Sequence, residues 1–233
     1  SSEKFHQCKD ERINLLEHAL KNQVGIFSNF EMPVNLAFGA TIVQSGAKDG
    51  SSAISEAETA FEVAVNHSNY TEIQWYDDSL KVNKDRILSI EQHLLKAIER
   101  NELFLVFQPQ FLSQNQADIF GFEALLRWKS AELGFVSPNE FVPLAESLDY
   151  INIIGRFVID ETVGFIERQK KMGRHVNVAL NSSYKELLQN DYVQYLVDKL
   201  EKHNVEISQV HIEITETTIS EFIDVVLENL NKL

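Results

Sequence analysis

The 233-residue chain has a single cysteine, Cys8, and few basic residues. One cysteine excludes a disulfide scaffold and a zinc site built from several cysteines, and it fits a reducing compartment. The 21 Lys and Arg residues against 35 Asp and Glu residues give a formal net charge of -14 and a pI near 4.9. Such a surface repels polyanions, so we expect neither DNA nor RNA as a partner. A few arginines or metal ions can still hold a small anionic ligand.

Long hydrophobic runs are also absent. No apolar stretch reaches the length of a membrane-spanning helix, and the polar opening SSEKFHQCKDER lacks the pattern of a signal peptide. We therefore expect a cytoplasmic protein with no membrane contact from this stretch. An upstream region that anchors a longer parent protein in the inner membrane is compatible with this expectation.

The first third of the chain alternates between helical and extended periodicity. The expected elements are a helix at 11–22, a strand at 34–43, a helix at 52–67 and a strand at 70–76. The polar stretch 77–86 has no strong pattern, and we place a domain boundary there. The two predicted domains are residues 1–80 and 81–233.

From residue 87 onward, strands and helices alternate regularly. We expect strands at 103–111, 118–128, 175–181 and 209–215, and helices at 87–102, 137–148, 151–173, within 184–203 and at 220–233. Ser137 is the expected N-cap of the helix at 137–148, with Pro138 at its first position. This alternation favours an α/β fold with a mainly parallel sheet or a β/α barrel.

The predicted strand IFGFEALLRW carries two full charges, Glu123 and Arg127. Side chains alternate between the faces of a strand, so Glu123, Leu125 and Arg127 share one face. The other face is apolar and suits packing against helices; it consists of Phe122, Ala124, Leu126 and Trp128. Glu123 and Arg127 lie about 13 Å apart in an extended strand. Each therefore needs another partner, because an unpaired buried charge costs several kcal/mol.

Two later strands repeat this arrangement, with Asn181 and Glu213 on the polar face near their carboxyl ends. Each strand runs into a capping-box pattern, at 183–186 and at 218–221. Carboxyl ends of strands are where β/α barrels build their active sites. Together with Glu123, these side chains offer three oxygen donors for a hard cation such as magnesium, manganese or calcium.

Arg127 is placed to receive a phosphate oxygen. A structural explanation stays open for all these polar side chains. Polar residues at strand ends also cap helices, join ion networks or reach solvent, and the spacing alone does not decide between the two explanations.

Five segments resemble, in order, the EAL domain of bacterial cyclic di-GMP phosphodiesterases: FQPQF, GFEALLRW, SPNEFVPLAE, VALNSS and HIEITET. The resemblance covers about residues 87–233. It implies a TIM-like barrel of the EAL type with one antiparallel strand. It also implies hydrolysis of cyclic di-GMP to linear pGpG with Mg²⁺ or Mn²⁺, in bacterial second-messenger signal transduction.

The resemblance implies roles for particular residues. Metal ligation falls to Glu123, Asn181 and Glu213, catalysis to Glu123, and contacts to cyclic di-GMP to Gln108, Leu125, Arg127 and Pro138. Two of these also have structural explanations. Gln108 could satisfy backbone groups beside Pro109, and Pro138 is explained as a helix start.

Residues 1–80 resemble the C-terminal half of a GGDEF domain, an α+β fold, through VNLAFGATI and AETAFEVAV. This part is degenerate, because Glu58 and Val65 stand where that family usually has Asp and Lys. The Gly-Gly-Asp-Glu-Phe signature is absent. We therefore expect a regulatory or spacer role for this domain and no cyclase activity.

The EAL resemblance stops before the family's Asp-Asp pair, its lysine and its further glutamate. We therefore expect a fragment of a longer protein with a partial barrel, and we expect the 233 residues alone to be inactive. A homodimer in which two chains complete one another is an alternative. The segment AESLDYINIIG also departs from the glycine-containing AEETGLI-like turn of the family. Beside the phosphodiesterase, a non-catalytic cyclic di-GMP receptor and a pure interaction module remain alternative functions.

Overall fold

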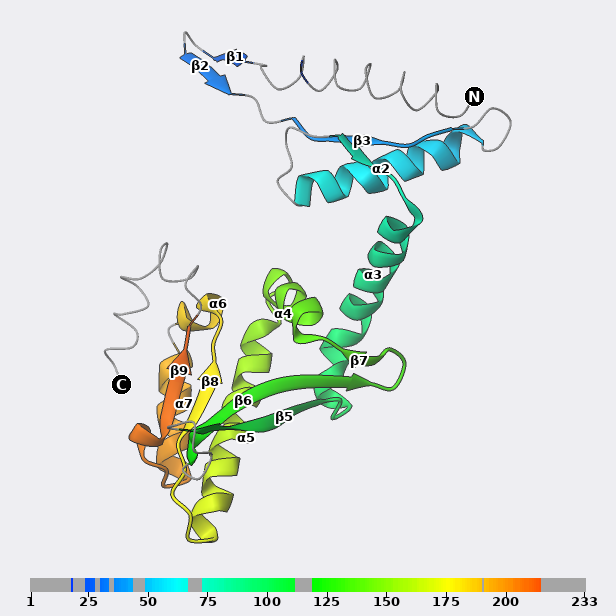
Figure 1. The fold of residues 1–233 in the computed structure, drawn as a ribbon. Helices are drawn as coiled ribbons and strands as arrows, with labels where there is room; N and C mark the ends of the chain where they lie inside the picture. The colour runs from blue at the N-terminus through cyan, green and yellow to red at the C-terminus, as the bar shows by residue number, and fades with distance from the viewer. Residues whose placement is uncertain are drawn as a thin grey trace. The chain divides into compact units, whose positions relative to one another are not determined.

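A computed structural model describes residues 18, 24–27, 30–33, 36–43, 49–66, 73–111, 119–189 and 191–214, with backbone alone at 24–27, 30–33 and 66. The chain divides into two compact units, Ser1–Ile87 and Leu88–Leu233, which we describe separately (Figure 1). The predicted helix at 220–233, the capping box at 218–221 and almost all of the predicted helix at 11–22 lie outside the described residues.

The first unit contains two small sheets. Its elements are β1 (Val24–Phe27), β2 (Phe30–Pro33), β3 (Phe38–Ala40), α2 (Gly50–Asn66) and β4 (Ile73–Trp75). β1 and β2 form an antiparallel pair that the sequence did not predict, and β3 and β4 pair in parallel. α2 and β4 confirm the helix at 52–67 and the strand at 70–76. Of the strand predicted at 34–43, only β3 forms within the described residues 36–43.

Close packing of α2 on β3 depends on Gly39. A Cβ atom at this position would lie 2.2 Å from the carbonyl oxygen of Ala57 and 2.2 Å from the backbone nitrogen of Phe61. Any side chain larger than hydrogen would therefore push the helix away from the strand.

The helix α3 (Asp78–Glu99) contains the division between the two units. Its first turns occupy the stretch at 77–86, in which we recognised no strong pattern, so the predicted helix at 87–102 begins earlier than expected. Asp77 explains the helix start, because its Oδ1 atom accepts a hydrogen bond from the Ser79 N–H at 2.7 Å, as an N-cap does.

The second unit is built on a five-stranded sheet. Its strands are β5 (Leu103–Phe111), β6 (Ile119–Ser130), β7 (Gly134–Val136), β8 (Val178–Asn181) and β9 (Val210–Glu213). The order is β5-β6-β8-β9, and β7 also pairs with β6. β6, β8 and β9 run parallel, whereas β5 runs antiparallel to β6. The antiparallel first strand agrees with what the EAL resemblance implies.

The helices of the second unit lie where the sequence periodicity predicted helices. They are α4 (Pro138–Ser147), α5 (Ile151–Lys171), α6 (Tyr184–Leu187) and α7 (Tyr192–Lys202), with a 3₁₀ turn at Ile207–Gln209. Pro138 begins α4 as expected, and the Ser137 N–H donates to Glu140 Oε2 at 3.0 Å. Basic residues crowd the last turn of α5, and Gly173 follows with a φ of +72°.

One face of the sheet packs against helices, and α5 runs along it (Figure 1). Phe107 of β5 stacks on Phe165 of α5 with ring centroids 3.8 Å apart. Trp128 of β6 is 0% exposed, meets Phe141 edge to face, and donates its indole N–H to Glu102 Oε2 at 3.0 Å. We call this the helix-covered face. The predicted alternation along 122–128 is confirmed, because Ala124 and Trp128 on this face are buried.

None of the helices in the described part of the chain combines the length and the apolar character needed to cross a membrane.

Candidate functional site

The other face of the second unit's sheet carries most of the predicted site residues, and we call it the open face. It comprises Phe104, Val106, Gln108, Glu123, Leu125, Arg127, Ala179, Asn181, His211 and Glu213. Strand register sets their neighbours. Gln108 lies opposite Glu123 across the β5–β6 pair, and Asn181 is the register partner of Glu213 across the β8–β9 pair. Register partners point to the same side of a sheet, so these four polar side chains share one surface.

Two of the three predicted metal ligands touch directly. Asn181 Nδ2 donates a hydrogen bond to Glu123 Oε1 at 3.0 Å. This bond uses the amide nitrogen, so the amide oxygen is the atom of Asn181 that is suited to a cation. Glu213 follows on the neighbouring strand. The structure therefore brings Glu123, Asn181 and Glu213 to adjacent positions on the open face.

The loop after β8 holds Asn181 in place through several contacts. The Ser182 N–H donates to the carbonyl oxygen of Glu213 at 3.0 Å, which joins β8 and β9 beyond their last register pair. The Ser182 hydroxyl lies 2.6 Å from the Tyr192 hydroxyl. The Ser183 N–H donates to Glu186 Oε2 at 2.6 Å, which confirms the predicted capping box at the start of α6.

Glu186 is a buried carboxyl group behind this loop. Burial raises its pKa to about 8, and the nearby Glu146 carboxylate adds to the rise. Glu186 is pressed against α5 at Gly155, where a Cβ atom would lie 1.6 Å from Glu186 Oε1. Burial likewise raises the pKa of the neighbouring Tyr192 hydroxyl. These groups form a polar layer on the helix side of the strand end that carries Asn181.

The residues expected to contact a ligand do not all lie on the open face. Leu125 and Arg127 lie on the open face, opposite Val106 and Phe104, which are 43% and 37% exposed. Arg127 Nη1 donates to the carbonyl oxygen of Leu126 at 2.8 Å. Pro138 instead begins α4, away from the sheet register that groups the others.

The oxygen-rich set fits a hard divalent cation, but it is incomplete by itself. Among the described residues, no group of three or more His, Cys, Asp and Glu side chains could hold a metal ion. Glu123 and Glu213 are the two carboxylates of the set, and the third donor is the Asn181 amide. Oxygen donors of this kind suit Mg²⁺ and Mn²⁺, which also accept water and substrate oxygens as ligands.

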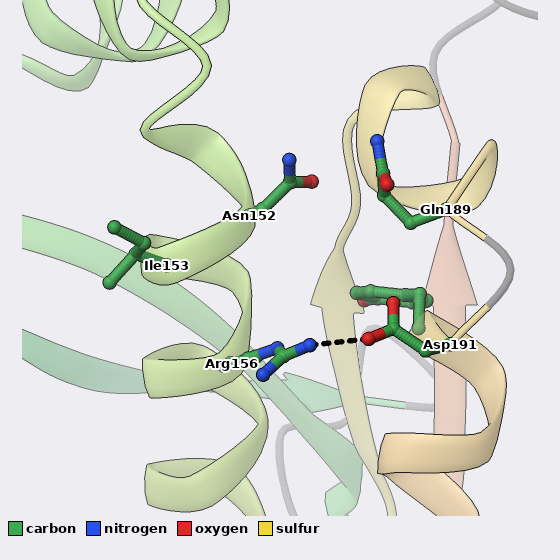
Figure 2. A pocket seen from close by; sticks show the side chains of 6 residues that line it. Asn152, Ile153, Arg156, Gln189 and Asp191 are labelled. Carbon is green, nitrogen blue, oxygen red and sulfur yellow. Dashed lines mark hydrogen bonds and ion pairs between the residues drawn. The ribbon is translucent and has the colours of Figure 1, made fainter.

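A separate cavity of about 380 Å³ lies between α5 and the segment around the start of α7 (Figure 2). Its lining residues are Asn152, Ile153, Arg156, Gln189, Asp191 and Tyr192. Arg156 Nη2 and Asp191 Oδ2 form an ion pair at 2.5 Å along one edge. None of the residues predicted for the site lines this cavity. The lining comes from two separate segments, 152–156 and 189–192, so no local spacing in the sequence could have found it.

Comparison with known proteins identifies relatives that align with most of the chain. The bifunctional diguanylate cyclase/cyclic di-GMP phosphodiesterase MucR of Pseudomonas aeruginosa is 33% identical over 167 residues, which are 68% of this chain and 24% of that protein. The cyclic di-GMP phosphodiesterase PdeR of Escherichia coli is 25% identical over 191 residues, which are 82% of this chain and 28% of that protein. The chain thus spans about a quarter of the length of these relatives.

A solved structure gives the same relationship in three dimensions. The PaMucR phosphodiesterase in complex with c-di-GMP superposes with a TM-score of 0.59 at 32% identity, covering 62% of this chain and 58% of that one. The sequence pattern of the EAL domain matches residues 91–233, which include every strand of the five-stranded sheet. The chain therefore belongs to the EAL-domain family.

Proposed function

We propose that the protein is a phosphodiesterase that hydrolyses cyclic di-GMP to linear pGpG, and that its site is the open face of the second unit's sheet. The sheet would then be part of a TIM-like barrel whose interior is this face. Membership in the EAL-domain family supports the reaction class. The phosphodiesterase names of MucR and PdeR, and the c-di-GMP bound in the PaMucR structure, support the substrate.

The observation that carries the proposal is the hydrogen bond between Asn181 Nδ2 and Glu123 Oε1, with Glu213 in register beside Asn181. Three oxygen-bearing side chains from three parallel strands stand together, although 58 residues separate the first two. In this proposal Glu123, Asn181 and Glu213 hold Mg²⁺ or Mn²⁺. A cation held there would supply charge stabilisation at the phosphate and would lower the pKa of the attacking water.

Neighbouring residues would bind the dinucleotide. Arg127 offers a guanidinium group to a phosphate, which its planar donors match. Gln108 lies opposite Glu123 and offers an amide to a polar edge of the ligand. Leu125 and Val106 provide apolar surface for a purine. Pro138 is the weakest member of this set, because its position is accounted for by the start of α4.

The proposal is tested by incubating the full-length protein with cyclic di-GMP and Mg²⁺ or Mn²⁺ and separating the products by chromatography. We expect pGpG to accumulate and EDTA to stop it. Binding of cyclic di-GMP in calorimetry with Ca²⁺, without turnover under any metal, would favour the receptor. Absence of both binding and turnover would favour an interaction module.

For residues 1–80 we propose a GGDEF-like regulatory or spacer domain. The parallel β3–β4 pair with α2 packed on it is compatible with the closing part of such a fold. The name of the P. aeruginosa relative, which joins both activities, supports it as well. We expect no cyclic di-GMP to form when the protein is incubated with GTP and Mg²⁺.

A further inference from the structure

The end of α4 and the turn after it make polar contacts with the loop that follows Asn181. The Ser183 hydroxyl donates to Glu146 Oε1 at 2.5 Å, and Lys185 Nζ donates to the Glu146 carbonyl oxygen at 2.6 Å. Lys185 also lies 3.3 Å from Asp149 Oδ1. Residues almost 40 positions apart in the sequence are thus joined by three polar contacts.

Asp149 gives the turn after α4 an unusual backbone conformation. Its φ is +59°, a conformation that glycine adopts freely and that Asp tolerates better than most residues. The EAL family, which the sequence resembles, usually has a glycine-containing turn at this place, and this chain departs from it. Asp149 instead supplies a carboxylate that reaches Lys185. The departure from the family pattern therefore adds a contact between the turn and the loop.

The hydroxyl of Ser183 is used twice. It accepts a hydrogen bond from the Lys185 N–H at 3.3 Å and donates its own proton to Glu146. The backbone N–H of the same residue is bound by Glu186. Ser183 is therefore fixed from three directions, and it stands two residues after Asn181.

We propose that Glu146 is a positioning residue for the cation site. By fixing Ser183, it holds the strand end so that the Asn181 amide stays against Glu123 with its oxygen directed to the cation. The turn between α4 and α5 thereby sets how tightly the site binds a divalent metal. This inference rests on the proposed function only through the assignment of Glu123, Asn181 and Glu213 as the metal ligands.

The test is a Mn²⁺ titration of the full-length protein, followed by electron paramagnetic resonance and performed without substrate. We expect Glu146→Ala to weaken Mn²⁺ binding about 10- to 100-fold, the effect of losing a group that orients a metal ligand. Glu146→Gln keeps an acceptor oxygen for the Ser183 hydroxyl and should restore binding to within a few-fold. Ser147→Ala is the matched control, because its exposed hydroxyl bonds only to the Leu144 carbonyl oxygen in its own helix.

Kinetics give a second measurement. Glu146→Ala should lower kcat at fixed Mg²⁺, and raised Mg²⁺ should restore it, while the KM for cyclic di-GMP stays near the wild-type value. If Glu146→Ala does not fold, Ser183→Ala decides the question, because it removes the same hydrogen bond from the other side. Unchanged Mn²⁺ affinity in these variants would overturn the positioning role alone. Absence of Mn²⁺ binding by the wild type would overturn both this role and the proposed metal site.

Discussion

The two faces of the sheet in the second unit are built for different purposes. The helix-covered face contains Trp128, Phe107 and Ala124, and its polar groups find partners inside the protein, as the indole N–H of Trp128 does with Glu102. The open face contains Gln108, Glu123 and Asn181 and keeps apolar side chains such as Val106 partly exposed. One face stabilises the fold, and the other carries the side chains that we propose bind the metal ion and the ligand.

The strand β6 belongs to both faces at once, because its side chains alternate. Arg127 and Trp128 are neighbours in sequence and point to opposite sides of the sheet. The rigidity of the covered face therefore fixes the positions of the residues on the open face. Substitutions on the two faces should accordingly affect different measurements.

The largest expected effect is on the covered face. Trp128→Ala should lower the free energy of unfolding by about 3–5 kcal/mol, because it leaves a cavity and strips the buried Glu102 of its indole donor. Urea denaturation of the purified protein measures this. Arg127→Ala is the matched control and should change stability by less than about 1 kcal/mol. Equal losses in the two variants would contradict the division of labour between the faces.

The next effect is a dependence of stability on pH that comes from Glu186 behind the covered face. Its pKa is about 8 in the folded protein and near 4.5 in the unfolded chain. Between these values the folded state keeps a proton that the unfolded state has lost, so stability falls as the pH rises through this window. Since each pKa unit corresponds to about 1.4 kcal/mol, the full loss between pH 4.5 and pH 8 is on the order of 5 kcal/mol.

Glu186→Gln should remove this dependence and be more stable than the wild type at pH 8, because an amide keeps the acceptor for the Ser183 N–H without a charge. Urea midpoints at pH 5 and pH 8 measure the slope. Glu201→Gln, the same change at an exposed position of α7, should leave the slope as it is. Parallel slopes for the wild type and Glu186→Gln would show that this carboxyl group does not titrate as described.

On the open face we expect loss of activity without loss of stability. Glu123→Gln should lower turnover of cyclic di-GMP by at least about 100-fold, because replacing even a group that orients a metal ligand costs 10–100-fold. Its urea midpoint should match the wild type. Glu201→Gln again serves as the control, with full turnover. Full activity in Glu123→Gln would remove this residue from the site.

The smallest effect concerns the turn after α4. Asp149→Gly should raise the free energy of unfolding by less than about 1 kcal/mol, because relief of the positive φ is offset by the larger entropy of the unfolded chain and the lost Lys185 contact. Asp149→Ala should instead destabilise by roughly 1 kcal/mol, since alanine is strained at this φ. Thermal melts in which stability decreases from Asp149→Gly through the wild type to Asp149→Ala would support the positive φ of this turn. An alanine variant more stable than the wild type would contradict it.

Periodicity predicted much of the sheet and of its two faces. The strand at 103–111 coincides with β5, and the one at 118–128 lies almost wholly within β6. Both predictions succeeded because a long alternation of side-chain character is typical of a β-strand. β7 was missed since three residues are too few to show a period. The helix over 77–86 was missed because its signal is a single capping side chain, Asp77, and not an apolar pattern.

The site could be predicted as separate residues but not as an arrangement. Alternation placed Glu123, Asn181 and Glu213 on polar faces of their strands, and the EAL resemblance gave them roles. Contact between Asn181 and Glu123 depends on β6 and β8 being neighbours, which no local pattern specifies. The same holds for Glu146 and Ser183, whose bond spans 37 residues. The roles of all seven residues stay predictions: Gln108, Glu123, Leu125, Arg127, Pro138, Asn181 and Glu213.

The close fit of Gly155 against Glu186 restricts how this part of the sequence can change. The carboxyl group that caps α6 occupies the volume in which any side chain at position 155 would begin. A methyl group can enter only when the capping residue shortens, so the two positions must vary together. Gly155→Ala should therefore lower the stability of the fold when it is made alone and be tolerated together with Glu186→Ser. Substitutions at these two positions are thus expected to occur together.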